Sequence, residues 1–281
     1  GAPCADADLC NGDETCDGLG LCQPGAPPAI DDGNDCTTDS CDPVLGVLHT
    51  PVTAGTSCDD GDVCTGNDSC DASGTCQSTG AAPAGTDCGV DQVCSGGGSC
   101  VTIPAAPELT APAIDRTVSS TVALTTSFLY EGPNPLQTGV APATIVARRA
   151  SVLRGDVIDR DTGAPIAGAV VSIDRHSEFG QTLTRADGRF DLVINGGGQL
   201  TLSVRKPGFL PAQRRLEVPW QSYVGVDTIA LVTLDTQATV IDFSAPIQVA
   251  SGSLTSDSDG TRQAVLMFPQ SATATMVLQN D

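Results

Sequence analysis

The spacing of its cysteines constrains this chain more than any other feature of the sequence. All 13 cysteines lie in the first hundred residues. Two units follow the pattern C-x5-C-x5-C-x5-C, and these are Cys4, Cys10, Cys16 and Cys22, then Cys58, Cys64, Cys70 and Cys76. Residues 30–42 form a reduced copy that keeps the second and third positions, Cys36 and Cys41, and a last partial copy holds Cys88, Cys94 and Cys100. Repetition at this period predicts an array of small repeat units.

The same segment indicates an oxidising compartment. Residues 1–100 contain no Trp, Tyr or Phe, so they lack the side chains of an ordinary core. Small domains in this situation use disulfides instead, and disulfides persist outside the cytosol. Zinc is disfavoured, because no cysteine pair has C-x-x-C spacing and the chain has only two histidines. We therefore predict an extracellular or cell-surface protein.

The pairing of the cysteines does not follow from their spacing, since four cysteines permit three pairings. The reduced copy lacks the first and fourth positions together, and the loss of both ends of one bridge leaves no orphan thiol. This favours nested pairing as a hypothesis, with Cys88 unpaired. The predicted pairs are Cys4–Cys22, Cys10–Cys16, Cys36–Cys41, Cys58–Cys76, Cys64–Cys70 and Cys94–Cys100.

Charge is distributed unevenly along the chain. Residues 1–115 hold 19 Asp and Glu with no Lys or Arg, and residues 116–281 hold 15 acidic against 13 basic residues, so the formal charge of −21 divides into −19 and −2. Such a field repels nucleic acid and anionic membranes. It favours calcium, cationic partners or solubility alone.

Two acidic loops are candidate calcium sites, and calcium is the only cofactor that the sequence suggests. The first contains Asp31, Asp32, Asn34 and Asp35, followed by Asp39, and the second contains Asp59, Asp60 and Asp62, followed by Asn67 and Asp68. Calcium takes six to eight oxygen ligands, but neither loop has the D-x-[DN]-x-[DN]-G pattern with a distal Glu. The alternative, which we favour, is that these residues form turns and keep the segment soluble. Asn67 also begins an N-x-S glycosylation sequon.

Beyond residue 102 the sequence predicts a linker and two β modules. Residues 103–150 are Pro-rich, and within them residues 117–130 are compatible with a strand or a short helix. Residues 151–234 contain alternating runs at 151–159, 168–174, 181–186, 189–194 and 199–206, separated by turn signals that are typical of a β-sandwich. Residues 235–281 predict strands at 236–243, 247–254, 262–268 and 273–278, which form a partial module with an exposed edge.

The residues from 154 to 209 carry a family resemblance. Thr162-Gly163, Asp187-Gly-Arg-Phe190 and Lys206-Pro-Gly-Phe209 resemble the carboxypeptidase regulatory-like, or transthyretin-like, domain, which implies a seven-stranded accessory sandwich without catalysis. Segments 128–145, 176–198, 207–223 and 245–278 resemble bacterial RHS/YD-repeat proteins, the bacterial relatives of teneurins, which implies a fibronectin-like plug and then a YD-repeat shell. The cysteine array resembles the stalks of exported deltaproteobacterial surface proteins.

No catalytic constellation is present in the sequence. There is no G-x-S-x-G, H-E-x-x-H or P-loop, and His176-Ser177-Glu178 is interpreted as a loop of the sandwich. Two basic pairs, Arg148-Arg149 and Arg214-Arg215, are either solvated surface or contacts for the acidic repeats of a neighbouring chain. An accessory subunit of an enzyme is therefore disfavoured.

We predict a mostly β, non-catalytic extracellular protein of structural or adhesive function that assembles into fibres through β-module edges. The alternative is the N-terminal base of an RHS-type shell that encapsulates and delivers a toxin. The expected partners are proteins, either further copies of this chain or a downstream YD-shell. No apolar run approaches the length of a membrane span. Because no signal peptide precedes the first repeat, we expect a processed or excised piece of a longer exported protein.

Overall fold

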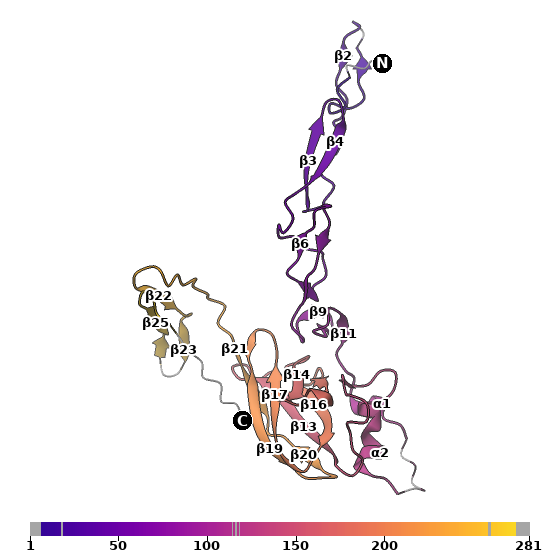
Figure 1. Cartoon of the computed structure of the whole chain (residues 1–281), viewed down its shortest axis with the longest axis vertical. Coiled ribbons are helices and arrows are strands. Elements are labelled where there is room, and N and C mark those ends of the chain that lie inside the picture. The colour runs from indigo at the N-terminus through magenta and orange to yellow at the C-terminus, as the bar shows by residue number, and fades with distance from the viewer. Residues whose placement is uncertain are drawn as a thin grey trace.

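The computed structural model describes residues 7–17, 19–113, 115, 117, 119–257 and 260–273. It is mostly β, as predicted. Figure 1 shows a long, narrow stalk of small hairpins, which ends on a β-sandwich, and a separate group of strands near the C-terminus. We use the name stalk for residues 1–102.

Each repeat of the stalk contains one antiparallel hairpin that carries its third cysteine. In the last repeat this position belongs to Cys94, which lies opposite Cys100 as Cys70 lies opposite Cys76. The hairpins are β1–β2 (Thr15–Cys16 and Cys22–Gln23), β3–β4 (Thr37–Asp42 and Gly46–Pro51), β6–β7 (Ser69–Cys70 and Cys76–Gln77) and β10–β11 (Gln92–Cys94 and Cys100–Thr102). Three further short strands are β5 (Thr65–Gly66), which pairs with β8 (Gly80–Ala81), and β9 (Asp87–Gly89), which pairs with β10.

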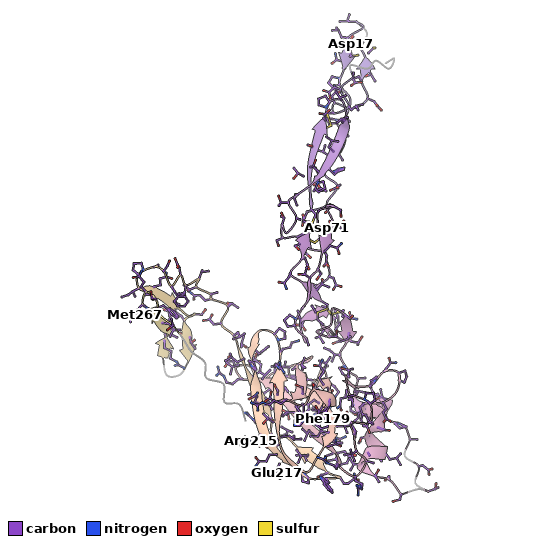
Figure 2. All side chains as sticks on the ribbon, in the orientation of Figure 1. Asp17, Asp71, Phe179, Arg215, Glu217 and Met267 are labelled. Atoms are coloured by element: carbon purple, nitrogen blue, oxygen red, sulfur yellow. A yellow bond between two sulfur atoms is a disulfide. The ribbon has the colours of Figure 1, made fainter. Side chains whose placement is uncertain are left out.

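The turns of these hairpins repeat because the sequence repeats. After the third cysteine, the carboxylate oxygen of Asp17, Asp42 or Asp71 accepts hydrogen bonds from two backbone N–H groups of its own turn. Side chains of Asp stabilise turns in this way. Asp17 and Asp71 are labelled in Figure 2, at two levels of the stalk. The backbone hydrogen bonds also lower the pKa of the Asp17 and Asp42 carboxyl groups, and a hydrogen bond from the Ser73 hydroxyl, with backbone hydrogen bonds, lowers that of Asp71.

The sandwich contains two five-stranded sheets. One has the order β12 (Gln137–Thr138), β15 (Gln181–Leu183), β14 (Val170–Ile173), β17 (Gly198–Arg205) and β19 (Ala212–Val218). The other has the order β16 (Arg189–Asn195), β13 (Ala150–Asp159), β21 (Ile229–Thr233) and β18 (Phe209–Leu210), with β20 (Tyr223–Gly225) parallel to β13. The five alternating runs predicted between residues 151 and 206 all contain strands, whereas β18 to β21 were not predicted.

The core lies between the two sheets because alternate side chains of each strand point inward. Leu153, Phe190, Leu192, Leu202 and Ile229 are almost completely buried within it. A turn at Asp187-Gly188 joins β15 in one sheet to β16 in the other. Gly188 has φ +78° there, and a Cβ atom would lie 2.5 Å from the carbonyl oxygen of Val157. Only glycine fits this turn without strain.

The segment before the sandwich packs on its side. After α1 (Pro107–Thr110), residues 117–130 form α2 (Val122–Thr126) and a 3-10 turn at Ser127–Leu129 rather than a strand. The hydroxyl oxygen of Thr121 caps α2 by accepting a hydrogen bond from the backbone N–H of Leu124. Leu129 and Leu136 then pack against Val152 and Val193 in a second apolar cluster.

The C-terminal strands form two small hairpins outside the sandwich. These are β22 (Gln248–Ser251) with β25 (Val265–Phe268), and β23 (Thr255–Asp257) with β24 (Gly260–Arg262). Residues 236–243 form no strand, contrary to our prediction, and most of the predicted strand at 273–278 lies outside the described residues. Val249, Leu266 and Met267 of the first hairpin are at least half exposed. Among the described residues, no helix is long and apolar enough to cross a membrane.

Candidate functional site: disulfide connections and charge clusters

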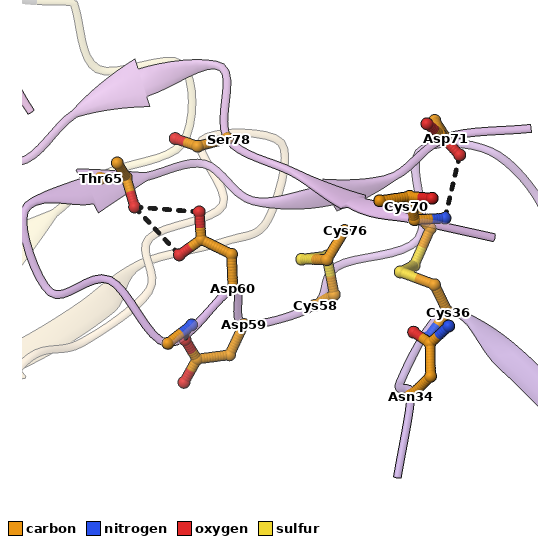
Figure 3. The surroundings of a disulfide bond; sticks show 12 residues. Asn34, Cys36, Cys58, Asp59, Asp60, Thr65, Cys70, Asp71, Cys76 and Ser78 are labelled. Carbon is orange, nitrogen blue, oxygen red and sulfur yellow. Dashed lines mark hydrogen bonds between the residues drawn. A yellow bond between two sulfur atoms is a disulfide. The ribbon is translucent and has the colours of Figure 1, made fainter. Parts of the chain in front are cut away.

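Between described residues, the disulfides of the stalk are of two kinds. Three of them join the second cysteine of one repeat to the third cysteine of the next, and these are Cys10–Cys41, Cys36–Cys70 and Cys64–Cys94. Two others join the first and fourth cysteines of a single repeat, and these are Cys58–Cys76 and Cys88–Cys100. The Cys36–Cys70 bond, which joins two repeats, appears in Figure 3. Disulfides therefore connect each repeat of the stalk to the next one.

This arrangement corrects most of the predicted pairs. The wrong pairs are Cys10–Cys16, Cys36–Cys41, Cys64–Cys70 and Cys94–Cys100, and Cys88 is bonded rather than unpaired. The Cys58–Cys76 pair agrees with the structure. Cys16, which we assigned to a disulfide, is free. Cys22 is disulfide-bonded, and its predicted partner Cys4 lies outside the described residues.

The physical reason for the error is that the repeats are not independent units. The reduced repeat did lose its first and fourth positions as a pair, as we inferred. It kept Cys36 and Cys41 because each bonds a different neighbouring repeat, Cys70 on one side and Cys10 on the other. The spacing of the cysteines cannot distinguish this arrangement from a bond between Cys36 and Cys41.

The predicted calcium ligands mainly stabilise the backbone of their own loops. Asp31 and Asp59 each accept a hydrogen bond from the N–H two residues ahead, and so do Asp32 and Asp60. Asn34 and Asp62 accept from the N–H of the following cysteine, Cys36 or Cys64, in the same way. Thr65 donates a further hydrogen bond to Asp60, as Figure 3 shows. Asp35 is exposed.

Folding brings together two carboxylate clusters at equivalent places in successive repeats. In the reduced repeat, Nδ1 of His49 lies 2.8 Å from Oδ1 of Asp39 and 3.5 Å from Oδ2 of Asp32. The hydrogen bond with Asp39 raises the pKa of His49 and lowers that of Asp39. In the next repeat, Asp59, Asp60 and Asp68 gather carboxylate oxygens within 4.8 Å of one another. Sequence reasoning grouped the acids by loop and missed the role of His49.

An arginine-rich cleft beside the sandwich was also missed. It has a volume of about 610 Å³ between α1, α2 and the β13–β16 pair. Oδ1 of the buried Asp191 lies 2.5 Å from Nε of Arg154, and Oδ2 lies 2.7 Å from Nη1 of Arg185. The guanidinium of Arg154 also lies 4.8 Å from the centre of the Tyr223 ring. Arg154 and Asp191 are direct partners across β13 and β16, so strand register was the signal that could have found this pair.

Other predicted residues lie on the surface. Asn67, the sequon residue, is exposed, and its glycosylation stays a prediction. Arg214 and Arg215 project from the edge strand β19, on which Figure 2 labels Arg215 and Glu217. His176 pairs with Glu178 at 2.8 Å, which lowers the pKa of Glu178.

Residues 145–231 match the family model of the teneurin TTR-like domain. The sandwich is therefore similar to the transthyretin-like domain of teneurins. Residues 29–52 and 57–79 match the model of a Dictyostelium (slime mold) repeat. Neither model describes an enzyme.

Individual teneurins show the same similarity over about a third of the chain. Teneurin-3 of Mus musculus is 39% identical over 107 residues, which is 36% of this chain and 4% of the relative. Teneurin-1 of Homo sapiens is 41% identical over 85 residues, or 30% of this chain and 3% of the relative. Teneurin-m of Drosophila melanogaster is 41% identical over 83 residues. The shared part is thus a small fraction of each teneurin.

Proposed function

We propose that this chain is a non-catalytic extracellular spacer, in which the stalk holds the transthyretin-like sandwich at one end of a stiff rod. The observation that carries the proposal is the crossing of three disulfides between successive repeats. Disulfides within single repeats leave the junction between two successive repeats free to bend, whereas disulfides between repeats restrain that junction. Such bonds persist in oxidising compartments, which supports a place outside the cytosol.

The contact between stalk and sandwich supports the same function. Nζ of Lys206, whose side chain is 8% exposed, lies 2.8 Å from Oδ1 of Asp87 in β9. At Gly168 of the sandwich, a Cβ atom would lie 2.6 Å from Cγ1 of Val93. An extended rod can set the position of the sandwich only if the two parts are joined firmly, and these contacts join them.

Small-angle X-ray scattering tests this proposal with a matched pair of variants. Replacing Cys36 and Cys70 by Ser removes a bond between repeats, and replacing Cys58 and Cys76 by Ser removes one within a repeat. We expect the first variant to have a shorter and broader distribution of interatomic distances than the second, because its rod bends at the junction. Equal distributions for both variants would refute the rod.

We further propose that copies associate through the C-terminal hairpins. The exposed apolar side chains of β22 and β25 and the unpaired edges of this two-stranded sheet support association. Sedimentation at increasing protein concentration tests this idea. Replacing Val249 and Leu266 by Lys is expected to abolish the larger species, while Val90→Lys in the stalk serves as the control. A wild-type chain that stays monomeric at high concentration contradicts it.

A second candidate function is the base of an RHS-type shell. It is favoured by the match of residues 145–231 to the teneurin TTR-like domain. The deciding observation is the gene sequence downstream of residue 281. YD repeats followed by a variable C-terminal segment would support the shell function, and their absence would favour the spacer function.

For the acidic loops we propose turn formation rather than a calcium site, since their carboxylates already accept backbone hydrogen bonds. Calcium added at millimolar concentration is then expected to leave the thermal midpoint of the stalk unchanged. A midpoint that rises with calcium and falls again with a chelator would restore the calcium site.

A further inference from the structure

The hairpin that carries Cys16 is built like the three hairpins that follow it. Cys16 lies directly opposite Cys22 across β1 and β2, as Cys70 lies opposite Cys76 across β6 and β7. In the three later hairpins this third cysteine is bonded to the preceding repeat. Cys16 is the one free cysteine among the described residues.

The turn glycine of the first hairpin gives a second, independent observation. Gly20, Gly46, Gly74 and Gly98 occupy the same place in the four hairpins, all with φ between 80° and 82°. A Cβ atom at Gly46 would touch Leu9, one at Gly74 would touch Thr37 and Pro51, and one at Gly98 would touch Thr65, all in the preceding repeat. Among the described residues, a Cβ atom at Gly20 would meet nothing within 4 Å.

Hydrogen bonds also join two of the later hairpins to the repeat before them. The N–H of Leu9, just before Cys10, donates to the carbonyl oxygen of Pro43 in the next hairpin. The side-chain amide of Asn34 donates to the carbonyl oxygen of Gly74 in the same manner. Each of the three later hairpins thus receives one disulfide and side-chain contacts from the repeat before it, and two of them receive a hydrogen bond as well.

We propose that the hairpin at Thr15–Gln23 is an open docking surface for a further repeat of the same kind, preceding this one in the polypeptide, whose second cysteine bonds Sγ of Cys16. The surface is continuous with the repeat-to-repeat interfaces already described. A second copy of this chain is not the occupant, because Cys10, Cys36 and Cys64 already have partners. In the bond-forming step the two thiols lose two protons and two electrons, and a disulfide oxidant such as oxidised glutathione is reduced to two thiols.

The experiment adds one further repeat to the N-terminus of the full chain. A copy of residues 58–79 fused before Gly1 places the copied Cys64 as far before Cys16 as Cys10 lies before Cys41, a separation of 31 residues. The fusion is oxidised in a glutathione buffer, alkylated without reduction, digested and mapped by mass spectrometry. We expect a peptide that links Cys16 to the copied Cys64, and alkylation to move from Cys16 to the copied Cys70.

The matched control is the same fusion with the copied Cys64→Ser, in which Cys16 should stay alkylated and the later disulfides unchanged. That control also shows that the extended chain folds. Alkylation that stays on Cys16 in the first fusion, a bond between copied Cys64 and copied Cys70, or a dimer through two Cys16 residues overturns the proposal. The test does not depend on the spacer function, since it measures only which cysteines pair.

Discussion

The four cysteine positions of a repeat have different roles, and the spacing of the cysteines does not show them. The first and fourth cysteines close their own repeat, as Cys58 and Cys76 do, while the second and third bond opposite neighbours. Cys64 and Cys70 are almost completely buried, so sulfur supplies the apolar interior that aromatic side chains supply elsewhere. A change at one such cysteine therefore affects a neighbouring repeat as well as its own.

At His49 we predict a measurable shift in titration. The carboxylate of Asp39 raises the pKa of His49 above its ordinary value of 6.5. The protonated form thus stabilises the fold fully below pH about 6.5, and this contribution disappears as the pH rises through the folded pKa. NMR titration of the imidazole should show a lower pKa in Asp39→Asn. The variant Asp35→Asn, which removes an exposed charge of the same repeat, should change it less, and equal shifts would contradict the pairing.

At Asp191 we predict a large loss of stability. Its carboxylate is 5% exposed and faces the side chain of Arg185, which is 12% exposed. Asp191→Asn leaves that guanidinium without its buried counter-charge and should lower the free energy of unfolding by about 3 kcal/mol. Asp187→Asn, which changes an exposed partner of the same arginine, should cost less than about 0.5 kcal/mol. Urea unfolding of both variants measures the difference, and similar values would argue against a buried ion pair.

Among the elements, the short strand β12 depends on one buried side chain. Gln137 is fully buried, donates to the carbonyl oxygens of Phe179 and Val193, and accepts from the N–H of Val193. It thereby joins the segment before the sandwich to the 3-10 turn at Ser177–Phe179 and to β16. Two residues of strand pairing alone are a weak attachment, so this amide decides where the segment lies.

Gln137→Leu should therefore destabilise the sandwich by about 2–4 kcal/mol, because three buried backbone groups lose their partner. Gln213→Leu on the exposed strand β19 is the matched control and should change stability by less than about 0.5 kcal/mol. Thermal unfolding of the two variants distinguishes these outcomes. A Gln137→Leu chain as stable as the control would show that the segment is held by its apolar contacts alone.

In the whole molecule, two parts are stabilised by different means. The stalk has disulfides and few buried side chains, whereas the sandwich has a continuous apolar core and no cysteine. Each disulfide contributes about 2–4 kcal/mol on typical figures. The two parts should therefore respond differently to a reducing agent.

We predict that reduction unfolds the stalk and leaves the sandwich folded. Hydrogen exchange with mass spectrometry should show loss of protection up to residue 102 and retained protection in β13 to β17. The thermal midpoint of the sandwich should fall by no more than a few degrees, since only contacts such as Lys206 with Asp87 are lost. Simultaneous loss of protection in both parts would mean that the sandwich needs the stalk to fold.

The sequence by itself determined the features that depend on neighbours along the chain. Alternation between residues 151 and 206 predicted five strands, Asp187-Gly188 predicted a turn, and the cysteine spacing predicted a disulfide-stapled stalk. The hairpin that Asp-Gly favours did not form there, because β15 and β16 lie in different sheets. Only the tertiary structure decided which cysteines pair, that His49 lies beside Asp39, and that Gln137 belongs to the sandwich. The reason is that disulfides, ion pairs and edge strands depend on distance in space. Spacing of five residues is the same whether a cysteine bonds its own repeat or the next one.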